Sequence, residues 1–325
     1  MSNGRDTCRN SGSGIVGDQR EGIFPFAERY LIDQGNYANS NFMIKKIMPG
    51  INELSVVKFK GAAFMTAEDI IPIEEPLEIK LEYGPFSNRI IRSLAVTMRT
   101  PGNDEELALG FLFTEGILQN EYVLAVVHES TFCMEQKQNI IIVKLDDSSS
   151  PILQHAERNF YTTSSCGVCG KSSIAAIRTV SIFSNSAEPY LMVNKDILYE
   201  LPGRLRQEQD NFSATGGIHA AGLFSAAGEL ILLREDVGRH NALDKVIGRA
   251  FTTETMPLNQ HLLVLSGRAS FELVQKAVMA GIRIIAAMGA PSSLAVELAL
   301  EFDITLIGFL SNKRFNIYTS GHRIF

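Results

Sequence analysis

The chain has 325 residues, of which 45% are hydrophobic and 20% are charged, and its formal net charge is −6. This composition excludes disorder over most of the chain, and the acidic balance argues against nucleic acid or an anionic membrane as a partner. The length favours two domains, and four cysteines are too few for a disulfide scaffold.

The N-terminal region is polar and lacks the apolar core of a signal peptide, so we expect a cytoplasmic protein. No stretch is apolar enough to cross a membrane. Residues 1–50 show little periodicity and are predicted to form a flexible arm. We expect a β-rich domain with one helix at 51–160, a mobile loop and connector at 161–193, and an α/β domain at 194–325.

Apolar and polar residues alternate in the predicted β-rich domain, as they do in strands that bury one face. The strands expected there are residues 55–60, 77–82, 89–98, 123–127 and 139–145. Asn103 or Asp104 is placed to cap one helix that ends near Gly116. Glu105 and Glu106 would lie in the positive first turn of that helix.

The predicted connector contains two of the four cysteines, Cys166 and Cys169, two residues before Lys171. Such a pair is usually half of a zinc site, a redox dithiol or a sulfur-carrying nucleophile, and it can also be two buried structural cysteines. No other Cys or His shows paired ligand spacing, so we expect no metal. The surrounding Gly and Ser residues predict exposed backbone, and Lys171 would lower a thiol pKa, which favours a reactive thiolate.

From residue 194 onward, helical and strand patterns alternate. The expected helices are 194–207, 239–251, 270–280 and 292–301, with a Gly-rich turn after the first. The expected strands are 222–225, 229–234, 261–265, 283–287, 304–309 and 314–319. This order predicts an α/β fold, α+β overall, with a mostly parallel sheet and helices on both faces. Ligands of such sheets gather at the carboxyl ends of the strands.

Six segments together resemble the FdhD family, the formate dehydrogenase accessory sulfurtransferases. They are Arg99–Asn103, Leu109–Gly116, Ser165–Lys171, Thr215–Gly222, Arg234–Lys245 and Leu265–Ser270, and the resemblance runs from about residue 55 to the end. It implies a sulfur carrier whose Cys166 forms the persulfide, with Cys169 as its partner and Lys171 beside them.

The resemblance also implies partners and a fold. The sulfur donor would be a cysteine desulfurase, and the bound substrate would be the molybdenum bis(molybdopterin guanine dinucleotide) cofactor on its way to the catalytic subunit of formate dehydrogenase. Family members tend to be homodimers, and their C-terminal domain is similar to the three-layer α/β/α fold of cytidine deaminases. Zinc deaminases need His-x-Glu and Pro-Cys-x-x-Cys. The nearest segments here, 240–242 and 291–295, lack that glutamate and both cysteines, so we expect no zinc.

The candidate cofactor-binding residues are glycines, hydroxyls, histidines and cations near strand ends and helix starts, where phosphates bind well. They are Thr215, Gly216, Gly217, His219, Arg234, Asp236, Gly238, Arg239, His240, Asn241, Asp244, Lys245, Ser266, Gly267, Arg268, Pro291, Ser292, Gly308, Phe309, Leu310, Ser311, Asn312, Lys313 and Arg314. The cations among them, with the exception of Lys245, are expected to form one positive cleft on the acidic protein.

Most of these positions have an ordinary structural alternative. Residues 215–217 are equally consistent with a plain turn, and His219 with a histidine buried in the core. Lys245 can belong to a solvated helix face, and residues 308–314 can form a hairpin turn. Ser270 and Ser292 can simply cap helices. At the level of function, a cofactor-binding chaperone without sulfur chemistry and a dithiol oxidoreductase remain alternatives to the sulfurtransferase.

Overall fold

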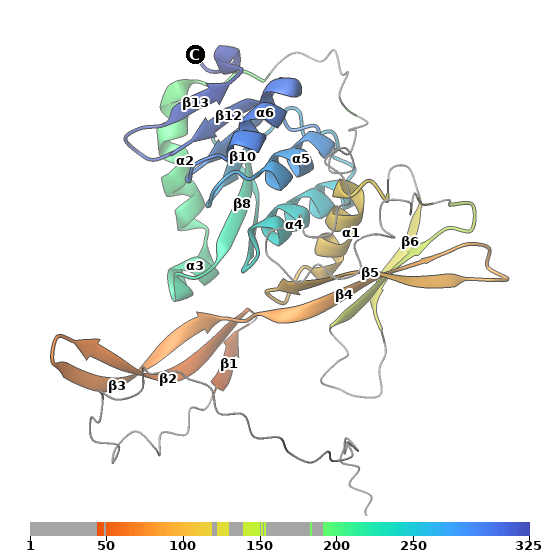
Figure 1. Cartoon of the computed structure of the whole chain (residues 1–325), viewed down its shortest axis with the longest axis horizontal. Helices are drawn as coiled ribbons and strands as arrows, with labels where there is room; N and C mark the ends of the chain where they lie inside the picture. Colours follow the sequence, from red (N-terminus) through yellow and green to blue (C-terminus); the bar gives the residue numbers. More distant parts are fainter. Residues whose placement is uncertain are drawn as a thin grey trace, which may run out of the picture. The chain divides into compact units, whose positions relative to one another are not determined.

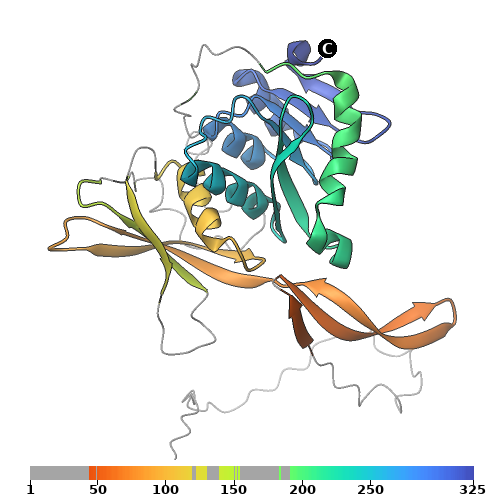
Figure 2. The same ribbon diagram turned by 180° about the vertical axis from the view of Figure 1, so that it is seen from behind.

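The computed structural model describes residues 44–48, 50–118, 122–129, 139–149, 151, 153, 183 and 191–325 (Figures 1 and 2). These residues belong to one compact unit that extends from residue 43 to residue 325. Cys166, Cys169 and Lys171 lie outside the described residues. Among the helices that are described, none is long and apolar enough to cross a membrane.

The first sheet has three antiparallel strands, β1 (Ile44–Met48), β2 (Ile51–Lys60) and β3 (Ala63–Pro72). Strands β2 and β3 pair over their whole length, from Ile51 opposite Pro72 to Lys60 opposite Ala63. Regular structure thus begins at Ile44, inside the predicted arm, because β1 pairs with the start of β2; the flexibility of the arm stays a prediction.

A second sheet has the strand order β5-β4-β7-β6. Its strands are β4 (Glu75–Tyr83), β5 (Ile90–Arg99), β6 (Val123–His128) and β7 (Ile140–Leu145). The inward residues of β4 are fully buried and pack against helix α1 (Asp104–Thr114). The predicted strands and the predicted helix are confirmed here, since their apolar patterns specify one buried face. Asn103 occupies the N-cap position of α1, but its side chain makes no capping hydrogen bond.

The third sheet has the order β13-β12-β11-β10-β8-β9. Its strands are β8 (His219–Phe224), β9 (Leu230–Asp236), β10 (Leu262–Leu265), β11 (Ile284–Ala287), β12 (Thr305–Gly308) and β13 (Asn316–Thr319). Of its five pairings, only β10–β11 and β11–β12 are parallel. The expectation of a mostly parallel sheet is wrong, because β8–β9 and β12–β13 are joined by short turns, which connect only antiparallel neighbours.

Helices cover both faces of this third sheet. The helices are α2 (Lys195–Gln207), α3 (Asp210–Thr215), α4 (Arg239–Thr252), α5 (Phe271–Met279) and α6 (Ser293–Glu301). In β10, Leu263 and Leu265 pack in the cluster with α4, α5 and α6, whereas Leu262 and Val264 face α2. The fold is thus mixed α/β, as predicted, while the closer likeness to cytidine deaminases stays a prediction. The unpredicted helix α3 lies between α2 and the expected Gly-rich turn at Gly216 and Gly217.

Helices α1 and α4 cross in backbone contact, and two glycines make this possible. A Cβ atom on Gly110 would lie 1.8 Å from the carbonyl oxygen of Asp244, and one on Gly248 would lie 1.8 Å from that of Glu106. Helix α1 therefore packs on both the second sheet and α4. The division into domains at residue 160 stays a prediction.

The last residues of the chain pair with the residues that precede α2. Val193 forms an isolated parallel bridge with Ile324, next to the short 3-10 helix η4 (Gly321–Arg323). The N–H of Val193 donates to the carbonyl of Arg323 at 2.9 Å, and the N–H of Lys195 donates to that of Phe325 at 2.8 Å. The last described residues before α2 are therefore fixed by the final residues of the sequence.

Candidate functional site

Most of the predicted site residues meet at one edge of the third sheet. Strand β8 runs opposite to both β9 and β10, so β9, β10, β11 and β12 all point the same way. Their carboxyl ends lie beside the start of β8, where His219 pairs with Asp236. We call this the strand-end edge; it comprises His219, Asp236–His240, Ser266–Ser270, Met288–Ser292 and Phe309–Arg314.

The loops that follow β10, β11 and β12 are hydrogen-bonded to one another at the strand-end edge. The N–H of Gly289 donates to the carbonyl of Gly267 at 2.9 Å, and the N–H of Phe309 donates to that of Gly289 at 3.1 Å. Gly289 must lack a side chain, because a Cβ atom would lie 2.8 Å from Cγ and 2.9 Å from the backbone nitrogen of Arg268. The three loops therefore form one continuous backbone surface.

His219 is a neutral imidazole on this surface. Its ring lies against Gly267, with Nδ1 3.3 Å from the position that a Cβ atom of the glycine would take. Burial lowers the pKa of His219, and the charges of Arg239 and His240 lower it further, against a smaller opposing effect of Asp236. The ring therefore offers both a hydrogen-bond donor and an acceptor at neutral pH.

His240 links the starts of α4 and α5. Its Nε2 lies 2.9 Å from Oε2 of Glu272 and 3.3 Å from Oγ of Ser270. Ser270 occupies the N-cap position of α5, but its side chain makes no capping hydrogen bond, so the simple capping interpretation is wrong. Both contacts use the same nitrogen, so this is not a catalytic triad, in which the acid and the nucleophile bind different nitrogens of the histidine.

The exposed cations of the edge come from the loops after β10 and β12. Arg268, Lys313 and Arg314 are exposed, and Arg239 is half-buried at the first position of α4. The Ser311 hydroxyl accepts from the N–H of Arg314 at 3.1 Å, so residues 311–314 form a tight hairpin turn into β13. Ser292 caps α6 through the N–H of Ala295. These features place cations and the N-termini of three helices at one edge, which suits an anionic ligand.

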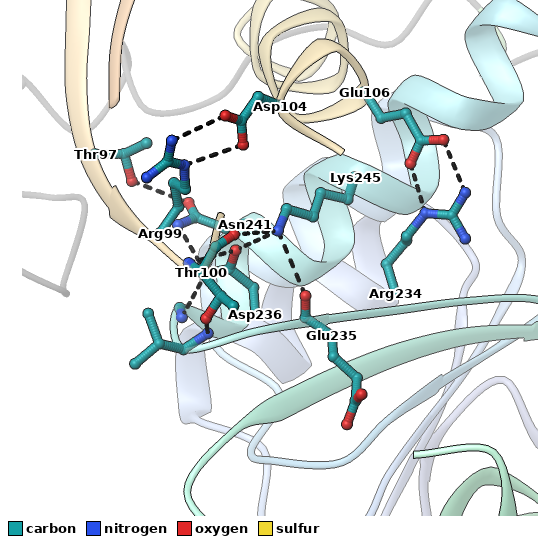
Figure 3. Close-up of polar contacts among 12 residues, drawn as sticks. Thr97, Arg99, Thr100, Asp104, Glu106, Arg234, Glu235, Asp236, Asn241 and Lys245 are labelled. Carbon is teal, nitrogen blue, oxygen red and sulfur yellow. Dashed lines mark hydrogen bonds and ion pairs between the residues drawn. The ribbon is translucent and has the colours of Figure 1, made fainter. Parts of the chain in front are cut away.

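Four of the predicted residues, Asp236, Gly238, Asn241 and Lys245, take part in a buried network (Figure 3). Lys245 places its ammonium 2.7 Å from Oδ2 of Asp236 and donates to the carbonyl of Thr100 at 2.9 Å. The other carboxylate oxygen of Asp236 accepts from Gly238 N–H at 2.8 Å and from Asn241 Nδ2 at 3.1 Å. This network fastens the segment around Thr100 to the start of α4, so the solvated-face alternative for Lys245 is wrong.

Asp244 belongs to a second buried network. Lys276 on α5 donates to Oδ2 of Asp244 at 3.0 Å and to the hydroxyl of Thr114 at 2.9 Å. Burial would lower the pKa of Lys276, but Asp244 and Glu115 outweigh this effect and raise it. Lys276 therefore stays charged and joins α1, α4 and α5. The sequence analysis did not predict this role, and the only indication of it is a lysine within an otherwise apolar helix.

Residues 215–217 lie at the end of α3, near Pro72. Gly216 has a left-handed φ of 67° and ends the helix, with its N–H on the carbonyl of Phe212. The N–H of Gly217 donates to the hydroxyl of Thr215. Because both N–H groups are already paired, the geometry favours the plain turn, and a phosphate contact here stays a prediction.

Arg234 does not join the other cations. Its guanidinium makes two hydrogen bonds to Glu106 on α1, at 2.5 and 2.8 Å. It also lines a cavity of about 590 Å³ formed by the loop after β5, α3 with the residues before it, and β9. Sequence reasoning missed this cavity, although Arg99–Asn103 had contributed to the family resemblance.

These observations define a class of protein: a mixed α/β protein with an anion-attracting edge of a sheet. Residues 72–325 match the FdhD/NarQ family, and the chain belongs to that family. It is 46% identical over 272 residues to the sulfur carrier protein FdhD of Streptomyces avermitilis, covering 83% of this chain and 94% of the relative. The protein of that name from Saccharolobus solfataricus is 38% identical over 275 residues, 85% of this chain and 98% of the relative.

A solved structure shares the fold. The structure of a formate dehydrogenase accessory protein from Desulfotalea psychrophila superposes with a TM-score of 0.61 at 21% identity, covering 85% of this chain and all of the other. Among the described residues, no three His, Cys, Asp or Glu side chains gather closely enough to hold a metal ion. The expectation of no zinc at the cysteine pair stays a prediction, because that pair lies outside them.

Proposed function

We propose that this protein is a cytoplasmic sulfur carrier that serves formate dehydrogenase. The observation that carries the proposal is the similarity to proteins named sulfur carrier protein FdhD, at 38–48% identity over more than nine-tenths of their length. The link to formate dehydrogenase is supported by the name of the similar solved structure. The family resemblance of the sequence supplies the finer expectations: a cysteine desulfurase as donor, the molybdenum cofactor as bound substrate and a homodimer.

The chemistry requires one persulfide-forming cysteine, and we assign this role to Cys166. Its thiolate attacks the terminal sulfur of the donor's persulfide; the donor's S–S bond breaks and the donor leaves as a thiolate. The sulfur can then leave as hydrosulfide when the Cys169 thiolate attacks Sγ of Cys166, which forms a Cys166–Cys169 disulfide. A cellular dithiol reductant restores both thiols for the next cycle. Lys171 would favour the thiolate form.

We propose that the cofactor binds at the strand-end edge. A cofactor that carries several phosphates needs cations and helix N-termini, and Arg239, Arg268 and the starts of α4, α5 and α6 supply them. Neutral His219 can donate a hydrogen bond to a pterin or guanine ring, or accept one from it, without adding charge. The carboxylates of Asp236 and Asp244 already have buried protein partners, so we propose that they support this edge from the interior.

The test separates sulfur loading from cofactor handling. After incubation with a cysteine desulfurase and cysteine, mass spectrometry should find one added sulfur on Cys166, and Cys166→Ala should neither load sulfur nor activate formate dehydrogenase. Arg268→Ala should load sulfur normally and activate poorly, and Cys133→Ala should behave as the unchanged protein. Activation by a variant lacking both Cys166 and Cys169 would instead favour a chaperone, and reversible dithiol cycling with a reductase an oxidoreductase.

A further inference from the structure

Phe309, the first residue after β12, has a backbone conformation that aromatic residues rarely adopt. Its φ is 53°, which lies in the left-handed region, where a bulky side chain crowds the backbone. Four other non-glycine residues in the described part of the chain have a left-handed φ, and all four are polar. The conformation of Phe309 is therefore strained, and the surrounding structure must hold it.

The backbone on either side of Phe309 supplies this constraint. The N–H of Phe309 donates to the carbonyl of Gly289 at 3.1 Å, and the N–H of Leu310 donates to the last carbonyl of β11 at 3.0 Å. The side chain of Leu310 is buried in the cluster that includes α2. Before Phe309, Gly308 packs so closely that a Cβ atom would lie 2.8 Å from Cδ of Pro291. These contacts fix the backbone of Phe309 independently of its ring.

The ring of Phe309 does not belong to the hydrophobic core. Phe309 is 39% exposed and is absent from the three hydrophobic clusters that the described residues form. Glycine or asparagine would adopt the same φ at a lower cost. Neither the backbone nor the core therefore calls for phenylalanine at this position, and strained residues of this kind are common where a protein grips a ligand.

The surroundings of the ring suit a ligand that joins a flat ring to phosphate groups. The guanidinium of Arg314 lies over the Phe309 ring, 6.0 Å from its centre. Gly289, which accepts the N–H of Phe309, belongs to the loop that leads into α6, and the N-terminus of a helix attracts anions. An aromatic face, a cation and a helix start thus lie together, as they do where proteins bind nucleotides.

We propose that the ring of Phe309 is the face on which the flat heterocycle of the bound ligand stacks. This inference rests on the proposed function, which gives the strand-end edge a ligand with phosphate groups and a pterin or guanine ring. Stacking requires no particular pattern of hydrogen bonds, so Phe309 contributes affinity for any flat base. The rigid backbone holds the ring in place before the ligand arrives, which lowers the entropic cost of binding.

The test uses the full chain and two probes, guanosine monophosphate and ribose 5-phosphate, which lacks the base. Chemical-shift titrations followed at the N–H groups of Gly289 and Leu310 should show that the unchanged protein binds guanosine monophosphate about tenfold more tightly than ribose 5-phosphate. Phe309→Asn should lose this preference and bind ribose 5-phosphate as before. Phe309→Tyr, which keeps an aromatic face, should retain the preference.

Thermal unfolding separates a role in ligand binding from a role in the fold. Phe309→Asn should unfold at the same temperature as the unchanged protein or at a higher one, because asparagine tolerates the left-handed φ. Phe86→Asn is the matched control. Phe86 is exposed and lies beside an arginine, Arg89, but it belongs to the turn between β4 and β5, so its replacement should leave the binding of both probes unchanged.

The results that would overturn the stacking role differ from the result that would overturn the proposed function. An undiminished preference for guanosine monophosphate in Phe309→Asn would exclude stacking on this ring. Equal weakening of both probes, or a lower unfolding temperature, would assign Phe309 to the fold. If the unchanged protein bound neither probe, the cofactor site at the strand-end edge would be wrong, and the stacking role with it.

Discussion

One ammonium group, that of Lys276, holds together oxygens from two other helices. It lies 3.0 Å from the carboxylate of Asp244 on α4 and 2.9 Å from the hydroxyl of Thr114 on α1, and all three residues are buried. A buried ion pair adds little by itself, but removal of one partner leaves an uncompensated charge in the interior. The pair is therefore a sensitive point of the fold.

Lys276→Met should lower the free energy of unfolding by about 3–5 kcal/mol at pH 7, because the Asp244 carboxylate would be buried without a cation. Burial raises the pKa of Asp244 above its unfolded value. The folded variant then takes up a proton more readily than the unfolded chain, so the loss should shrink as the pH falls through the raised pKa. Urea unfolding followed by circular dichroism at pH 7 and pH 5 measures the loss of unfolding free energy and its dependence on pH.

The exposed Lys313→Met is the matched control and should leave the stability unchanged. A loss of the same size at both pH values would contradict the account.

At the residue scale, the sequence indicated which polar residues are structurally important but not which residues they contact. Asp236, Asp244 and Lys245 stood out as a dense polar run, yet their partners Thr100, Thr114 and Lys276 are distant in the chain, and no local pattern records such contacts.

At the scale of elements, the α1–α4 crossing depends on two glycines inside helices. Alanine is the better helix former, so the glycines indicate that something else is required at these positions. Here it is close backbone approach, since any Cβ atom would collide with the facing helix. Helices α1 and α4 had been expected from their periodicity, but their contact had not, because periodicity shows which face is buried and not what covers it.

Gly110→Ala or Gly248→Ala should destabilise the protein by about 3 kcal/mol or more, because the clashing atoms belong to the backbone and cannot turn away. Gly203→Ala is the matched control: Gly203 also lies inside a helix, α2, but a Cβ atom there meets nothing within 4 Å. That change should raise the stability by about 0.5–1 kcal/mol through helix propensity. Thermal unfolding of the three variants measures both effects, and a small loss at Gly110 and Gly248 would refute the close crossing.

At the scale of the whole molecule, the polar and apolar contacts join the predicted β-rich domain to the predicted α/β domain. Thr100 is hydrogen-bonded to Asp236 and Lys245, and α1 packs on both the second sheet and α4. The strand order of the third sheet was partly predictable, because strand–helix–strand repeats imply parallel neighbours. Three of its five pairings are antiparallel. The β12–β13 hairpin had been an alternative for residues 308–314, but no local pattern records that β8 pairs with β10.

We therefore expect the second and third sheets to unfold together. Native-state hydrogen exchange should give core amides of β4 and β10 the same opening free energy, within about 1 kcal/mol, because cooperative units share one opening reaction. The exposed end of the β2–β3 hairpin, residues 58–66, should exchange far faster and serves as the internal control. Exchange of β4 through a much easier opening, with β10 still protected, would show two independent domains.

The bridge between Val193 and Ile324 has a consequence for biogenesis. A ribosome makes Val193 long before the residues that pair with it, so this bridge cannot form until residue 324 has been made. The strand-end edge is in the same position, because its last loop, residues 309–314, emerges long after His219 and the other loops of the edge. A nascent chain thus cannot assemble this edge before residues 309–314 have been made, and any cargo must wait for them.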